Sequence, residues 1–238
     1  MKRLVVASLL VVAAGRLDAQ LAASSNAEPL PRSFFGGGAL YYGSPQGEFA
    51  NNVAGVFGGG GFMGWQVGSS PFALRADLGF SIYGSERRRM PLGSGALGLI
   101  MVDVNTTNNI AHGGIGLQMG LPGAGLRPYV GGSVGFAEFF TSSSVSGTHT
   151  STDNEPFASS TNLSDGTFAK TLFGGVYIPV GSRGGALDLG LRYHLNGEAR
   201  YLTERDITFD GGNNPVLHPR FSRADLLTFQ VGFAFKRR

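Results

Sequence analysis

The chain has 238 residues, contains no Cys and carries a formal net charge of +3. Without Cys, a disulfide framework, a thiol nucleophile and a thiolate metal site are excluded. Residues 1–19 hold three cations and one acid, which leaves 16 basic against 15 acidic residues in the remainder of the chain. We therefore expect no nucleic-acid partner, because such a partner requires a clustered basic face.

The N-terminus has the pattern of a secretory signal peptide. Lys2 and Arg3 precede the apolar run 4–14, which is too short to span a bilayer. We expect cleavage after Ala19. The predicted organisation is a signal peptide over 1–19, a periplasmic leader over 20–32 and a β-barrel over 33–238.

The remaining sequence alternates between apolar and polar residues, which is typical of strands. Eight strands are predicted, with these limits: 33–42, 52–67, 72–83, 106–121, from 126 onward, 167–178, 186–201 and from 227 onward. In the seventh strand, Leu187, Leu189 and Leu191 share one face, and Asp188 and Arg192 share the other. Charged residues make up only 15% of the chain, below the usual ~25%, so a water-exposed charged outer face is not expected.

These features favour an all-β fold, an eight-stranded antiparallel up-and-down transmembrane β-barrel. In such barrels the apolar side chains face lipid and the polar side chains face the lumen. Short turns are predicted at 68–71, 122–125 and 179–185, and long loops after the third, fifth (142–165) and seventh (202–221) strands. Short periplasmic turns and long external loops are the usual asymmetry, and the even strand number puts both termini in the periplasm of a bacterial outer membrane.

The start of the fifth strand has a motif of its own. It combines Arg127-Pro128-Tyr129 with Gly131 and Gly135, and has Ser133 where a further Gly is common. In this motif the chain resembles the opacity-type outer-membrane β-barrel family. The order of elements matches over about 33–238, and the resemblance implies a small integral protein of the outer membrane.

Eight strands enclose an interior just wide enough for side chains to fill it. The predicted lumen set is of mixed charge and comprises Arg75, Asp77, His112, Gln118, Lys170, Asp188, Arg192, His194 and Gln230. We expect a connected polar network with a structural role, since unpaired charges there are costly. The alternative is a path for protons or ions. Lys170 shares a face with Leu172 and Val176, so the pattern leaves its orientation open, and a bulge would turn it inward.

The predicted function is that of a structural or surface-interaction protein that acts through its external loops. Alternatives are a narrow channel for small or apolar solutes and a lipid A-modifying enzyme. Lipid A deacylases place a Ser two residues after a strand His, whereas His194 is followed by Asn196, which cannot act as a hydroxyl nucleophile. We therefore predict that the chain is not an enzyme, and we expect no cofactor and no metal.

The expected partners are outer-membrane lipid and lipopolysaccharide, the barrel-assembly machinery, and an extracellular partner that contacts the loops. The last strand has the pattern of strands that close outer-membrane β-barrels, because Leu227, Phe229, Val231, Phe233 and Phe235 share one face. Assembly signals often end on Phe, whereas three basic residues follow Phe235 here.

Overall fold

The computed structural model describes residues 34–68, 70–91, 101–120, 125–147, 156, 158–181, 184–204, 206–209 and 215–237. The predicted signal peptide and leader lie outside the described residues. No helix among the described residues has the length and apolar character required to cross a membrane.

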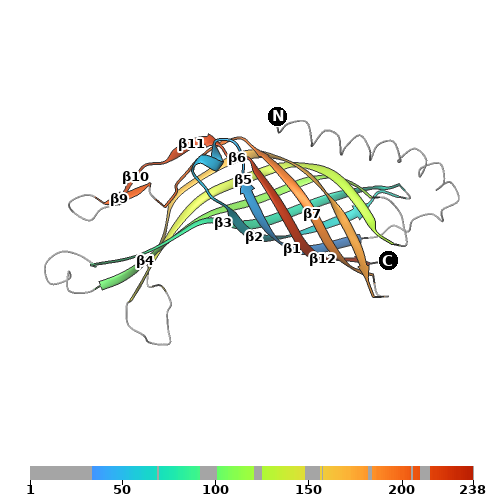
Figure 1. Ribbon diagram of the computed structural model, residues 1–238, viewed down its shortest axis with the longest axis horizontal. Coiled ribbons are helices and arrows are strands. Elements are labelled where there is room, and N and C mark those ends of the chain that lie inside the picture. Colours follow the sequence, from blue (N-terminus) through green and yellow to red (C-terminus); the bar gives the residue numbers. More distant parts are fainter. Residues whose placement is uncertain are drawn as a thin grey trace.

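Eight strands form a closed antiparallel barrel (Figure 1). Around the ring the order is β1, β12, β7, β6, β5, β4, β3 and β2, and β2 pairs with β1 to close it. Their bounds are β1 Phe34–Pro45, β2 Val56–Gln66, β3 Phe72–Pro91, β4 Met101–Gly120, β5 Arg127–Gly147, β6 Ala158–Val180, β7 Gly185–Asn196 and β12 Leu226–Arg237. The predicted up-and-down barrel is confirmed, because consecutive long strands are neighbours throughout.

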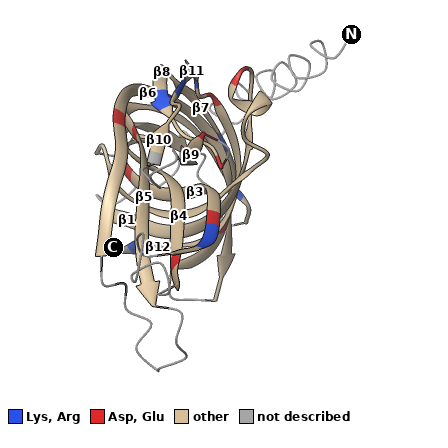
Figure 2. Ribbon diagram, turned by 90° about the vertical axis from the view of Figure 1, so that its left-hand side faces the viewer, with Lys and Arg blue, Asp and Glu red and all other residues tan. Residues whose placement is uncertain are grey.

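The two faces of the strands have opposite polarity from those of a water-soluble protein. Large apolar side chains are outward and exposed, as in Trp65 (63%), Leu78 (67%) and Leu191 (48%). Between them, Asp188 is fully buried at 0% and Arg192 is 9% exposed, both facing the barrel interior. Figure 2, a second view of the ribbon, shows that charged positions are sparse along the barrel strands. This polarity is stable only if hydrocarbon surrounds the barrel.

Four strands are longer than the sequence predicts. β3 continues to Pro91, and β4 begins at Met101. β5 continues to Gly147 and β6 begins at Ala158, so the predicted loop 142–165 is largely strand. The extensions leave the barrel together on one side of Figure 1. They lack apolar alternation because their Ser, Thr and Asn side chains need no lipid partner, while the backbone ladder continues.

The protruding strands mark the long-loop end of the barrel, and the other end has short turns. Tight turns near 68 and 181–184 use Gly68, Gly181 and Gly184 at φ of 58°, 68° and 82°, a left-handed conformation that Gly adopts at little cost.

The long-loop end also carries short elements between the barrel strands. The one-turn 3-10 helix η1 (Phe49–Asn51) follows β1. After β7, β8 (Glu198–Tyr201), which falls within the predicted seventh strand, pairs with β11 (Arg220–Arg223). Within the predicted last loop, β9 (Ile207–Phe209) pairs with β10 (Pro215–Leu217).

Candidate functional site: the interior of the barrel

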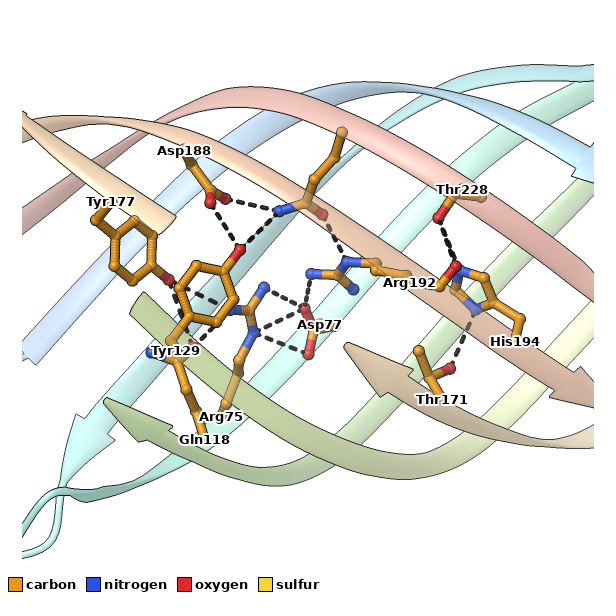
Figure 3. A network of polar contacts seen from close by, with 11 residues as sticks. Arg75, Asp77, Gln118, Tyr129, Thr171, Tyr177, Asp188, Arg192, His194 and Thr228 are labelled. Atoms are coloured by element: carbon orange, nitrogen blue, oxygen red, sulfur yellow. Dashed lines mark hydrogen bonds and ion pairs between the residues drawn. The ribbon is translucent and has the colours of Figure 1, made fainter. Parts of the chain in front are cut away.

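The centre of the polar interior is a carboxylate shared by two guanidinium groups (Figure 3). Asp77 Oδ1 accepts hydrogen bonds from Arg75 Nη2 at 2.9 Å and from Arg192 Nη2 at 2.6 Å. Arg75 is 1% exposed and Asp77 is 4% exposed. Because neither charge has access to bulk water, each depends on the other for solvation.

Gln230 connects this centre to a second carboxylate. Its Oε1 accepts from Arg192 Nε at 2.6 Å, and its Nε2 donates to Asp188 Oδ2 at 2.7 Å. Tyr129 donates its hydroxyl hydrogen to Asp188 Oδ1 at 2.6 Å. Two Arg and two Asp therefore form one hydrogen-bonded unit whose formal charges cancel.

Aromatic rings and a second amide enclose Arg75. Its Nη1 donates to Gln118 Oε1 at 2.7 Å. Its guanidinium carbon lies 3.8 Å from the ring centroid of Phe62 and 4.7 Å from that of Phe173. Tyr129 and Tyr177 stack beside it with centroids 4.4 Å apart. Ring faces stabilise a desolvated cation, so these contacts add to the ion pair. We call this assembly the polar network; its members are Arg75, Asp77, Gln118, Tyr129, Tyr177, Asp188, Arg192 and Gln230.

A histidine pair lies on the long-loop side of the polar network. The rings of His112 and His194 have centroids 5.1 Å apart, and Tyr41 lies 5.9 Å from His112. Thr171 contacts His194 Nδ1 at 3.0 Å. No group of three or more His, Cys, Asp or Glu that could hold a metal ion occurs in the described part of the chain.

An apolar cluster occupies the long-loop end of the interior. Phe49 of η1 is 0% exposed and its ring meets those of Tyr83, Phe139 and Tyr201 edge-on, at centroid distances of 5.8, 6.0 and 5.1 Å. We call these four residues the aromatic plug. Edge-to-face contacts at such distances are favourable, and they fix the position of η1 in the mouth of the barrel.

Hydrogen bonds from the last long connection hold η1 in place. Arg220 Nη1 donates to Asn52 Oδ1 at 2.7 Å, and Asn52 Nδ2 donates to the Tyr201 hydroxyl at 3.0 Å. Arg220 Nε also donates to Asp206 Oδ2 at 2.8 Å. Burial alone would raise the pKa of Asp206, but the hydrogen bonds from Arg220 and Thr203 outweigh it and hold this pKa below its ordinary value.

Eight of the nine residues predicted for the lumen point inward, and one does not. Lys170 is exposed on the outer face between Phe168 and Leu172. The register shift in the β5–β6 pairing lies between Thr141 and Ser142. It is not at Lys170, so it does not turn this side chain inward. The alternation of the strand, rather than the charge of the side chain, sets the direction in which Lys170 points.

Several interior residues were not identified from the sequence. Tyr129 belongs to the motif of the fifth strand but was given no role there, although its alternation with Val130 and Gly131 places it on the inner face. Tyr177 and Phe173 could have been found in the same way. Phe49 carries no such signal, because its position depends on a turn of irregular structure rather than on a strand period.

A closed barrel with an apolar exterior and a charged interior decides the class of protein. The chain is an outer-membrane β-barrel protein. No protein-family model matches the sequence, and a search of curated proteins finds no match.

Solved structures with a similar fold are bacterial outer-membrane proteins. Neisserial surface protein A is 12% identical, with a TM-score of 0.43 over 85% of this chain and 96% of that chain. A major outer-membrane protein from Thermus thermophilus is 13% identical, with a TM-score of 0.46 over 87% of this chain and 100% of that chain.

The prediction that the chain is not an enzyme is corrected. The outer-membrane protease OmpT from Escherichia coli is 10% identical, with a TM-score of 0.34 over 90% of this chain and 100% of that chain. This similarity concerns the fold alone, and nothing in the described structure shows the chain to be a non-enzyme. The fold gives no ground for excluding catalysis, and Asn196 in place of a nucleophilic Ser argues against a lipid A deacylase only.

Proposed function

We propose that the protein is an opacity-type surface protein whose closed barrel anchors a protruding four-stranded sheet outside the cell. In this arrangement the short-turn end and both termini lie in the periplasm. The extended ends of β3, β4, β5 and β6, together with β8 to β11, face the exterior and meet an extracellular partner.

The single observation that carries the proposal is the closure of the interior at two levels. The polar network fills the short-turn half with buried, mutually paired side chains, and the aromatic plug fills the mouth at the other end. Opening a water path would separate balanced charges and withdraw Phe49 from its ring contacts. Such an interior favours an anchor over a channel. No specific observation favours the narrow transport path considered from the sequence.

The chemistry of the protruding sheet supports a role in binding. On the face that continues the lipid-facing surface, directly paired positions include Ser85, Thr107, Ser142 and Thr161, which are hydroxyl side chains across four strands. Arg87 lies in the next row and is 70% exposed. It forms an ion pair with Asp103, in which Nη2 and Oδ2 are 2.8 Å apart. This surface is polar and hydrogen-bonding, which suits a hydrated ligand and does not suit the bilayer.

Single-cysteine labelling tests the proposed orientation, and the chain is suited to it because it contains no Cys. Thr107→Cys lies on the protruding sheet, and Ser70→Cys lies at the short-turn end. In intact cells a membrane-impermeant maleimide should label the first variant and not the second. Permeabilised cells should show labelling of both. Labelling of Ser70→Cys alone in intact cells would overturn the proposal.

A further inference from the structure

The outer surface of the barrel has a sharp boundary near the long-loop end. On β5 and β6 the directly paired residues Phe136 and Phe168 are outward and exposed at 55% and 57%. The next outward pair along the same strands is Glu138 with Gly166. Glu138 also accepts a hydrogen bond from Ser164 at 2.7 Å. On β6, where Gly166 and Ser164 follow Phe168 on the outer face, the hydrocarbon edge of the bilayer therefore lies at the row of Phe168.

Lys170 lies one outward row inside this boundary. It pairs directly with Val134 and Leu195, and its Nζ lies 6.0 Å from the ring centroid of Phe168, so the side chain reaches toward the boundary. It is the one charged side chain on the lipid face of the band among the described barrel residues. Two residues of strand span about 7 Å, a distance that an extended Lys side chain can cover to place its ammonium at the headgroup level.

A second cation lies above Lys170 on the same side of the barrel. The amide of Gly197 donates to the Phe168 carbonyl oxygen at 3.0 Å, and the amide of Arg200 donates to Asp165 Oδ2 at 2.6 Å. β8 therefore runs beside β6 beyond the boundary. Arg200 is exposed and lies directly opposite Phe221 of β11, which is 62% exposed.

The two cations differ from the other basic residue nearby. Arg223 donates to Asp225 Oδ2 at 3.2 Å, so its charge is already balanced. Within the described residues, neither the Lys170 ammonium nor the Arg200 guanidinium has a carboxylate partner. The carboxylates of Glu138 and Asp165 lie nearby and accept hydrogen bonds from Ser164 and from the Arg200 amide. The ammonium of Lys170 and the guanidinium of Arg200, one below and one above the hydrocarbon edge, therefore remain as cationic donors at the depth of lipid phosphate groups.

We propose that Lys170 and Arg200 bind the phosphate of a phosphorylated lipid headgroup in the leaflet at the long-loop end. The acyl chains of that lipid lie against Phe168, Leu172 and Val134. The cations bind the phosphate, and the exposed apolar residues contact the acyl chains. A free phosphate has no acyl chains and cannot make this second contact. The proposal rests on the proposed orientation only in identifying this leaflet as the outer one.

Native mass spectrometry of the full barrel tests the site. The protein is extracted from phosphatidylcholine nanodiscs that contain lipid A with both phosphates or lipid A freed of phosphate. We expect retention of the phosphorylated form alone. Each of Lys170→Gln and Arg200→Gln should weaken apparent binding about fivefold, the usual effect of one basic side chain near an anionic lipid surface. Lys170→Arg should retain binding.

Arg223→Gln is the matched control, since it removes a neighbouring exposed cation that is already paired, and it should change retention little. Heat-modifiable gel migration checks that each variant is folded. Equal retention of the two lipids, or unchanged retention by the Lys170→Gln/Arg200→Gln double variant, would overturn the site. Because nanodiscs expose both leaflets to the same lipid, this result is independent of the orientation measured by cysteine labelling.

Discussion

The polar network and the aromatic plug occupy opposite ends of one interior and hold their positions by different forces. The polar network consists of side chains from barrel strands, with two buried ion pairs to Asp77 at 2.9 and 2.6 Å. The aromatic plug depends on Phe49, which enters from the loop helix η1 and contributes only ring contacts and apolar burial. The network is therefore part of the barrel wall, whereas Phe49 can leave the plug without breaking any strand ladder.

This difference predicts that the two ends respond differently to substitution. Loss of one charge in the network leaves its partners without a counter-charge in a low-dielectric interior. Loss of the Phe49 ring from the plug removes contact area but leaves no polar side chain without a partner. The following measurements compare the two ends, beginning with the largest expected effect.

Asp77→Ala should be the most destabilising single change. It leaves Arg75 and Arg192 buried without their shared carboxylate, and breaking a buried pair costs about 3–5 kcal/mol. Urea unfolding in lipid vesicles measures the free energy. The control Asp103→Ala also removes a carboxylate that two Arg contact, but these are 70% and 61% exposed and remain solvated, so little change is expected. Equal effects at both sites would show that the network contributes no special stability.

Phe49→Ala should destabilise the barrel by about 3 kcal/mol, the low end for a buried Phe, because η1 can adjust at the rim. Faster hydrogen exchange in η1 should accompany the loss, with the barrel strands unchanged. Phe221→Ala removes a ring that is 62% exposed and serves as the control. If exchange accelerates equally in β3 and β7, the plug and the wall are a single unit and the comparison fails.

Gln230→Leu should cost about 1–3 kcal/mol, since Arg192 and Asp188 each lose a buried hydrogen bond. Tyr177→Phe is a milder change, because its hydroxyl makes contacts of 3.4 Å only. Urea unfolding under the same conditions compares the two variants. A larger effect of Tyr177→Phe would assign the stability of the network to the Tyr177 hydroxyl rather than to the amide connection.

Acid should loosen the plug before it affects the wall. Asp206 has a lowered pKa in the folded protein, so its contribution is fully present above the unfolded value of ~3.9 and is lost as pH falls through the lower folded value. Hydrogen exchange in η1 and β11 should therefore accelerate below about pH 4. In Asp206→Asn this acceleration should disappear, with exchange already fast at neutral pH. An unchanged pH profile in the variant would exclude Asp206 as the cause.

The sequence predicted the barrel wall well because lipid imposes a strict period of two. Leu191 and Arg192 could be assigned to opposite faces without any knowledge of their neighbours. The sequence left the orientation of Lys170 open, because its charge favours the lumen whereas its alternation with Phe168 and Leu172 favours the lipid face. A long flexible side chain near the bilayer edge can follow the alternation and still keep its charge solvated, since it leaves the strand outward and reaches water.

The interior partners and the protruding sheet were harder to predict. Tyr129 and Phe62 face inward, although aromatic residues also form the lipid-facing girdles of such barrels, so residue type alone does not place them. Ser142 and Ser159 lie in strands although their sequence is typical of a loop, because pairing with neighbouring strands outside the membrane requires no apolar face. Phe49 is placed by tertiary contacts with β-strands that are distant in sequence.

Planar-bilayer conductance tests the closed interior most directly. The purified wild-type barrel should insert without steady single-channel current, and Phe49→Ala should also remain silent, because the polar network still fills the short-turn half. Steady, voltage-independent conductance from the wild-type protein would contradict the account, since it requires a continuous water path past Arg75, Asp77 and Arg192.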